Sequence, residues 1–126
     1  MNKQLAKIES ARLEIQERGI LSFYITVKYE EGGCQSVGGI ALDEFHKPSD
    51  KRIGTAYGCE LIRSLLIELE VNDFSEMENK IIWVHGEGEG FNFKPKGVSA
   101  LKSNNNKSKP VIFDEILLEM KSVSEV

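Results

Sequence analysis

Cysteine and histidine are scarce in this sequence, which contains two residues of each. Cys34 and Cys59 belong to no Cys-x-x-Cys pair, whereas structural zinc sites usually draw their ligands from such closely spaced pairs. We therefore predict that the protein binds no metal. Two unpaired thiols are typical of a protein in a reducing cytoplasm.

Long apolar runs are also missing. No segment approaches the roughly 20 apolar residues that cross a bilayer, and residues 1–7 lack the apolar core of a signal peptide. We expect a cytoplasmic protein without membrane contact. Acidic residues outnumber basic ones by 20 to 16, so the net charge is −4. General nucleic-acid binding is not expected from this balance, which is still compatible with one basic pocket for a small anion.

Recognisable catalytic motifs are absent as well. The spacings of a phosphate-binding Walker A loop and of a calcium-binding EF-hand do not occur. His85 has the chemistry of a general base, but no Ser or Cys stands at a spacing that would make it part of a nucleophilic site. We expect no catalytic residue and no cofactor, and we keep a phosphodiesterase that uses His85 and Glu87 as an alternative.

The first half of the chain has the alternating pattern of β-structure. The 126 residues fit one domain, 1–126. Alternation predicts strands over residues 5–15, 20–30 and 34–43, although the first of these is rich enough in Glu, Lys and Ala to be helical instead. The Gly38-Gly39 pair predicts a bulge or a close approach inside the third strand.

The second half combines helical and strand patterns. Apolar residues at three- and four-residue spacing predict a helix over residues 55–70, and Thr55 is placed as its N-cap. We expect loops over 44–51 and 102–109, the latter flexible, strands over 80–85 and around 91–93, and a C-terminal helix from Asp114. The predicted fold is α+β: a mainly antiparallel sheet of about five strands packed on one long helix, with a short C-terminal helix.

The start of the predicted helix is the best candidate for a binding site. Helix N-termini carry unpaired N–H groups and the positive end of the helix dipole. Gly54 would let a ligand approach the backbone, Thr55 offers a hydroxyl, and Arg52 has the geometry for a bidentate grip on phosphate. The competing interpretation is that Gly54 and Thr55 only start a helix and that Arg52 is solvated.

A second candidate lies in and after the glycine-rich segment 86–90. Glu87 and Glu89 could accept hydrogen bonds from ribose hydroxyls, although a simple flexible turn is the alternative. Phe91 could stack on a base and Asn92 could read its edge, while core packing of Phe91 is the competing interpretation.

Two motifs in this chain resemble those of a small family of phage and prophage proteins. Gly38-Gly39-Ile40-Ala41-Leu42-Asp43 is similar to the family's G-G-x-x-L-D strand end, and residues 52–58 are similar to its R-x-G-[TS]-A-x-G helix start. The resemblance covers roughly residues 35–95. It implies a phage-encoded protein in the host cytoplasm, but it brings no established activity.

Small phage proteins of this size are often inhibitors of bacterial defence, and the resemblance suggests that role here. One such group, the anti-Thoeris and anti-CBASS sponges, binds nucleotide second messengers without cleaving them. This expectation comes from size and context, and the Gly-Glu repeat of residues 86–90 matches no motif of that group.

The leading hypothesis from the sequence is therefore a non-catalytic sponge for a small nucleotide, in a homo-oligomer whose subunits share the pocket. Its ligand-binding residues would be Arg52, Gly54, Thr55, Arg63, Phe91 and Asn92. The alternative is an inhibitor that binds a host defence protein directly through its acidic surface.

Overall fold

The computed structural model describes residues 1–101 and 108–124, which form two sheets, two α-helices and four short 3-10 turns. The elements follow one another along the chain as β1 (Asn2–Ile15), η1 (Glu17–Gly19), β2 (Leu21–Tyr29), β3 (Cys34–Ala41), β4 (Asp43–His46), η2 (Lys47–Ser49), β5 (Lys51–Gly54), α1 (Ala56–Glu68), η3 (Phe74–Met77), β6 (Ile81–Glu87), η4 (Gly90–Asn92), β7 (Lys94–Ala100), β8 (Val111–Ile112) and α2 (Phe113–Ser124).

The main sheet is antiparallel, with strand order β3-β2-β1-β6-β7-β8. Its strands form because apolar and polar residues alternate, so that one face can be buried. Phe23, Ile25 and Val27 of β2 are all fully buried on that face. The sheet curls towards its buried face, so that the Gln35 side chain of β3 donates a hydrogen bond to the Phe93 carbonyl just before β7 (2.9 Å). The buried face is therefore concave, and the opposite face is convex.

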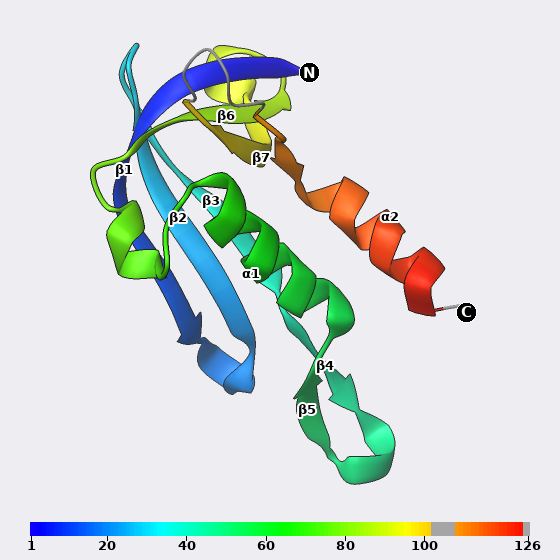
Figure 1. Cartoon of the computed structure of the whole chain (residues 1–126). Coiled ribbons are helices and arrows are strands. Elements are labelled where there is room, and N and C mark those ends of the chain that lie inside the picture. The colour runs from blue at the N-terminus through cyan, green and yellow to red at the C-terminus, as the bar shows by residue number, and fades with distance from the viewer. Residues whose placement is uncertain (102–107, 125–126) are drawn as a thin grey trace.

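Both α-helices pack beside each other against the concave face (Figure 1). Leu61, Leu65 and Leu69 recur on one side of α1 and are at most 1% exposed, because their spacing places them together against the sheet. The α2 helix joins the same core through Phe113 and Ile116.

The coarse prediction of an antiparallel α+β fold is confirmed, and so is the role of Thr55 as N-cap. The prediction of about five strands on one long helix is wrong in detail. The main sheet has six strands, and α1 and α2 are of similar length, at 13 and 12 residues. A two-residue strand such as β8 has no detectable alternation, which is why it escaped the count.

Residues 44–51 are not the predicted loop. They form most of a separate two-stranded sheet in which β4 pairs with β5, and this hairpin projects from the body below α1 (Figure 1). Its strands have four residues each and are largely polar, so the sequence pattern is that of a turn. Phe45 of β4 is 54% exposed and so lies outside the core.

Of the predicted flexible loop 102–109, residues 102–107 lie outside the described part of the chain. Ser108 and Lys109 are described, and both donate hydrogen bonds to Glu68. Among the helices of the described residues, none combines the length and the apolar character that crossing a membrane requires.

We predict that Gly58→Ala destabilises the protein even though alanine favours helices. An added Cβ at Gly58 would lie 2.1 Å from the Leu42 carbonyl oxygen, which is backbone and cannot move aside. The overpacking should lower the free energy of unfolding by about 1–3 kcal/mol, measured by urea denaturation. Gly54→Ala is the matched control, because nothing lies within 4 Å of its added Cβ. Equal stabilities of the two variants would contradict the predicted close contact.

Candidate functional site

The start of α1 is bonded to the end of β3 through a single carbonyl group. The Leu42 oxygen accepts hydrogen bonds from the Thr55 amide (3.2 Å) and from the Thr55 hydroxyl (3.0 Å). The same hydroxyl oxygen accepts from the Gly58 amide (2.9 Å) as the N-cap. The Thr55 hydroxyl thus has both a donor and an acceptor role within the protein.

Arg52 is likewise engaged by the protein itself. Its Nε and Nη2 atoms donate to Oδ1 of Asp43 (3.1 and 2.8 Å), and Nη2 also donates to the Asp43 carbonyl (3.1 Å). The other Asp43 oxygen accepts from the Leu21 amide (3.0 Å). The hydrogen bond from Arg52 is the main reason why the pKa of Asp43 lies below its ordinary value. This ion pair closes the base of the β4–β5 hairpin and ties it to β2.

A cavity of about 440 Å³ lies beside these residues, at the N-terminus of α1. Gly54 and Thr55, two of the predicted ligand residues, line it. Asp43 and Glu44 also line it, and the cation that faces them is Lys121 of α2. Because Arg52 neutralises Asp43 and Glu44 balances Lys121, the cavity has no net positive charge, which makes it less favourable for an anion than the sequence pattern suggests.

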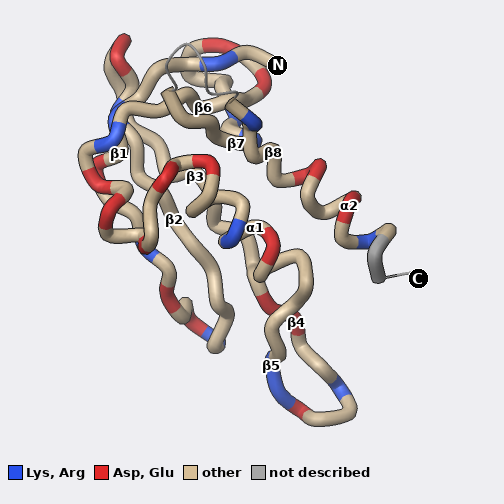
Figure 2. The backbone as a smooth tube through the Cα atoms, viewed as in Figure 1, with Lys and Arg blue, Asp and Glu red and all other residues tan. Residues whose placement is uncertain are grey.

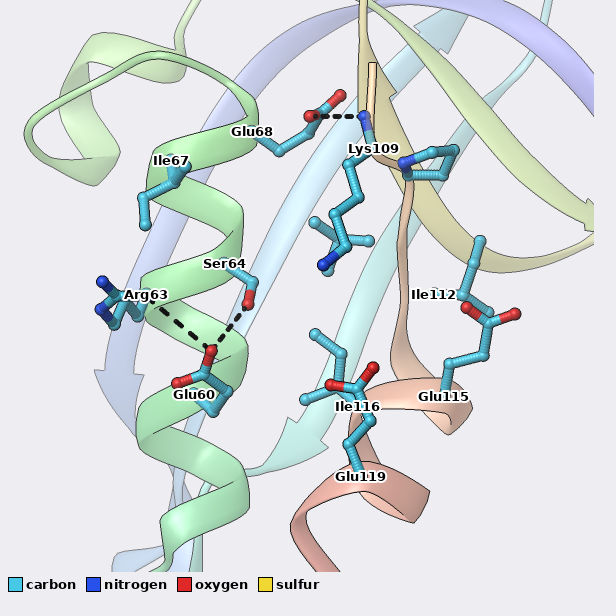
Figure 3. A pocket seen from close by; sticks show the side chains of 12 residues that line it. Glu60, Arg63, Ser64, Ile67, Glu68, Lys109, Ile112, Glu115, Ile116 and Glu119 are labelled. Carbon is cyan, nitrogen blue, oxygen red and sulfur yellow. Dashed lines mark hydrogen bonds and ion pairs between the residues drawn. The ribbon is translucent and has the colours of Figure 1, made fainter. Parts of the chain in front are cut away.

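Arg63 does not join this cavity. It lies further along α1 and lines a groove of about 250 Å³ between α1 and α2 (Figure 3). Its Nη1 atom is 3.9 Å from Glu60 Oε1, and that oxygen also accepts from the Ser64 hydroxyl (3.5 Å). The groove, here called the α1–α2 groove, is the second place where side chains of different elements converge.

Glu68 forms the end of this groove and is only 4% exposed. Its carboxylate accepts hydrogen bonds from the Ala100 amide (2.8 Å), the Ser108 hydroxyl (2.9 Å) and the Lys109 amide (3.1 Å). A buried carboxylate is stable only when it is satisfied in this way. Glu68 therefore anchors both the end of β7 and the residues just before β8 to α1.

Phe91 and Asn92 lie at the other end of the molecule from the start of α1. They belong to η4 and not to the predicted strand, which begins only at Lys94. Segment 86–90 is held near the N-terminus by the Asn2 side chain, which donates to the Gly88 carbonyl (3.0 Å), whereas α1 begins beside the projecting hairpin (Figure 1). Phe91 is fully exposed, and Phe93 is buried in the core.

The predicted ligand residues thus occupy separate places within one copy of the chain. Gly54 and Thr55 share a cavity, Arg52 is bonded to Asp43 beside it, and Arg63 lies in the α1–α2 groove. A site that unites all six would need more than one subunit, so the shared oligomeric pocket stays a prediction.

His85 forms a hydrogen bond with a buried serine. Its Nε2 atom is 2.8 Å from the Ser99 hydroxyl, which is 2% exposed and so is shielded from a substrate. Burial is the main cause that lowers the pKa of His85, and Lys3 lowers it further. Among the described residues, no cluster of three or more His, Cys, Asp and Glu side chains could hold a metal ion.

Comparison of this chain with protein-family models, with curated proteins and with solved structures found no match.

The sequence interpretation missed several residues that the structure places at these sites. Glu68 carries a usable signal, because a charged residue that follows Leu65 by three positions falls on the buried side of the helix. Glu115, Glu119 and Lys121 carry none, since their place depends on how α2 crosses α1.

We predict that Asp43→Ala lowers the free energy of unfolding by about 1–3 kcal/mol, because the Leu21 amide and Arg52 both lose a charged acceptor. The contribution of Asp43 in the unmodified protein is complete above its unfolded pKa of 3.8 and is lost as the pH falls through the lower folded value. Glu44→Ala is the control: this neighbour is exposed and should change stability by less than about 0.5 kcal/mol. Urea denaturation at neutral pH checks both, and a neutral effect of Asp43→Ala would rule out the structural role.

We also predict that His85 makes the fold sensitive to mild acid. Its folded pKa is depressed, so the unfolded chain takes up the proton first and stability falls as the pH drops below the unfolded value of 6.5. His85→Gln should show a smaller loss of unfolding free energy between pH 7 and 5. His46→Gln, on the hairpin, should lose as much unfolding free energy between pH 7 and 5 as the unmodified protein. If the unfolding free energy of the two variants depended on pH in the same way, His85 would not be the residue responsible.

Proposed function

We propose that this protein acts by binding, without a chemical step, and that its α1–α2 groove receives a segment of a partner protein that carries basic and apolar side chains. The observation that carries the proposal is the combination, in this one groove, of an apolar floor and two carboxylates, Glu115 and Glu119, that have no ion-pair partner among the described residues. Direct binding of a protein was the alternative from the sequence, and the engagement of Arg52 and Thr55 within the fold favours it over a phosphate grip.

The floor of the groove is apolar and lies between the two helices. Ile67 of α1 is 58% exposed, and Val111, Ile112 and Ile116 line the opposite side. Apolar side chains arranged between two helices are typical of grooves that receive an amphipathic segment of another protein. With a volume of about 250 Å³, the groove has room for a few side chains and not for a folded domain.

Acidic residues outnumber basic ones along the groove, which is lined by four carboxylates (Glu60, Glu68, Glu115, Glu119) and two cations (Arg63, Lys109). Glu115 and Glu119 are exposed one turn apart on α2 (Figure 3), and within the described residues neither has an ion-pair partner. Acidic positions predominate along both helices in Figure 2: they hold five acidic residues (Glu60, Glu68, Asp114, Glu115, Glu119) and two basic ones (Arg63, Lys121). Such a surface favours a partner segment with Lys or Arg beside its apolar residues.

The resemblance to phage proteins makes a host defence protein the expected partner. A nucleotide remains the second candidate, because the cavity at the start of α1 adjoins Ala56 and Tyr57, the first residues of the helix, and contains Lys121.

We predict that a fluorescein-labelled amphipathic peptide of leucine and lysine binds the protein, and that the same peptide with glutamate in place of lysine does not. The double variant Glu115→Gln/Glu119→Gln should weaken binding about three- to tenfold, as expected for the loss of two rim charges. Glu30→Gln/Glu31→Gln, an equal change of charge at the β2–β3 turn, is the control. Fluorescence anisotropy measures both peptides against the unmodified protein and against both double variants. Equal affinity for both peptides, or equal losses in both variants, would overturn the proposal.

A second experiment on the same protein distinguishes nucleotide binding from the binding of a partner protein. Nucleotide messengers are incubated with it, and the free concentration is measured before and after heating. Depletion before heating with intact recovery afterwards would show sequestration, and a cleaved product would show hydrolysis. Neither result is expected if the groove is the functional site.

A further inference from the structure

The convex face of the sheet is covered by neither α-helix and differs in charge from the helical side. Every second residue of β1, β2 and β6 points to it, because side chains alternate along a strand. Lys7 lies directly opposite Lys28, and Leu5 lies directly opposite Trp83. The residues that define this convex face are Lys3, Leu5, Lys7, Arg12, Tyr24, Thr26, Lys28 and Trp83.

Basic side chains predominate on the convex face. Lys3, Lys7, Arg12 and Lys28 are all exposed on it. Three acidic residues of the same strands, Glu9 at the β1 bulge, Glu14 and Glu87 at the end of β6, lie among them, so basic residues outnumber acidic ones by four to three. The helices carry the opposite excess, with five acidic residues against two basic ones.

The Lys7–Lys28 pair is the centre of this surface. Like charges directly opposite each other in neighbouring strands destabilise a sheet. A cavity of about 340 Å³ lies at the pair, lined by Lys7, Lys28, Glu9 and Asn79. Glu9 offsets part of the repulsion, and an anionic group bound between the two ammonium groups would offset the rest.

Aromatic rings lie next to these charges. Trp83 is half-buried on β6, and the Lys3 ammonium group is 4.5 Å from the centroid of its ring. Because Leu5 faces Trp83, the tryptophan is two residues, or about 7 Å, from Lys7 along the strand direction. Tyr24, also half-buried, lies further along the same face.

We propose that the convex face binds single-stranded nucleic acid, with backbone phosphates between Lys7 and Lys28 and a base stacked against Trp83 in place of the Lys3 ammonium group, which turns to a phosphate. Basic grooves with interleaved aromatic rings bind single strands in this way, because every base has a face that can stack. The proposal is independent of the α1–α2 groove, which lies on the other side of the sheet.

The test uses the full chain and a fluorescein-labelled oligothymidylate, with oligouridylate as the RNA counterpart. Anisotropy should show binding at 50 mM salt that weakens steeply at 200 mM. Lys7→Ala/Lys28→Ala should lower the affinity about tenfold and reduce the salt slope by about 1.4, for two phosphate contacts. This variant should be no less stable than the unmodified protein, since it removes a like-charge pair. Trp83 is the only tryptophan of the chain, so quenching of its fluorescence reports stacking at this face.

Lys47→Ala/Lys51→Ala on the β4–β5 hairpin is the matched control, because it removes the same charge from another surface. It should lower affinity less than about twofold if binding is local to the convex face. Equal losses in both double variants, no binding at 50 mM salt, or unchanged Trp83 fluorescence with bound oligonucleotide would overturn the proposal. Equally tight binding of a duplex or of an acidic peptide would also overturn it, because neither supplies free bases to stack.

Discussion

The carbonyl group of Leu42 is the contact on which the arrangement of this protein depends. It receives both hydrogen bonds of Thr55 and packs against Gly58 so closely that a side chain there would collide with it. One residue later, Asp43 ties Arg52 to Leu21. The end of β3, the base of the β4–β5 hairpin and the first turn of α1 are therefore held together at one point. The direction in which α1 crosses the sheet follows from this junction.

The same junction explains why the most distinctive motif of the sequence has two possible interpretations. Glycine, threonine and arginine before a helix are the residues of an anion site, and they are also the residues of a tight strand-to-helix connection. Arg52 and Thr55 find their partners, Asp43 and the Leu42 carbonyl, nine and 13 residues away. Local sequence cannot distinguish a guanidinium group that awaits a phosphate from one already bound to a carboxylate. Segments 38–43 and 52–58 meet at this junction, and their hydrogen bonds to each other hold them together without any ligand.

Elements with a long periodic pattern were predictable, and those defined by their surroundings were not. Strands β1 and β2 and helix α1 show their burial in their own spacing, which is why alternation and the apolar stripe located them. The β4–β5 hairpin and β8 are short and are stabilised by contacts to other segments. Of the candidate site residues, Gly54 and Thr55 line a cavity, and their role in binding stays a prediction, whereas the α1–α2 groove exists only because α2 returns to pack beside α1.

The distribution of charged side chains over the surface cannot be read from the amino-acid composition. A two-layer fold separates outward-facing residues by element, since strands send alternate side chains to the uncovered face and helices expose theirs on the opposite side. In this chain the uncovered face collects Lys3, Lys7, Arg12 and Lys28, while the two helices hold five acidic residues and only two basic ones. At physiological ionic strength the field of a surface charge decays within about 8 Å, so a ligand on one side hardly senses the other. An argument from net charge alone therefore excludes polyanion binding only for a protein whose charges are mixed evenly over its surface. The pairing of Lys7 with Lys28 in neighbouring strands shows that this condition does not hold here.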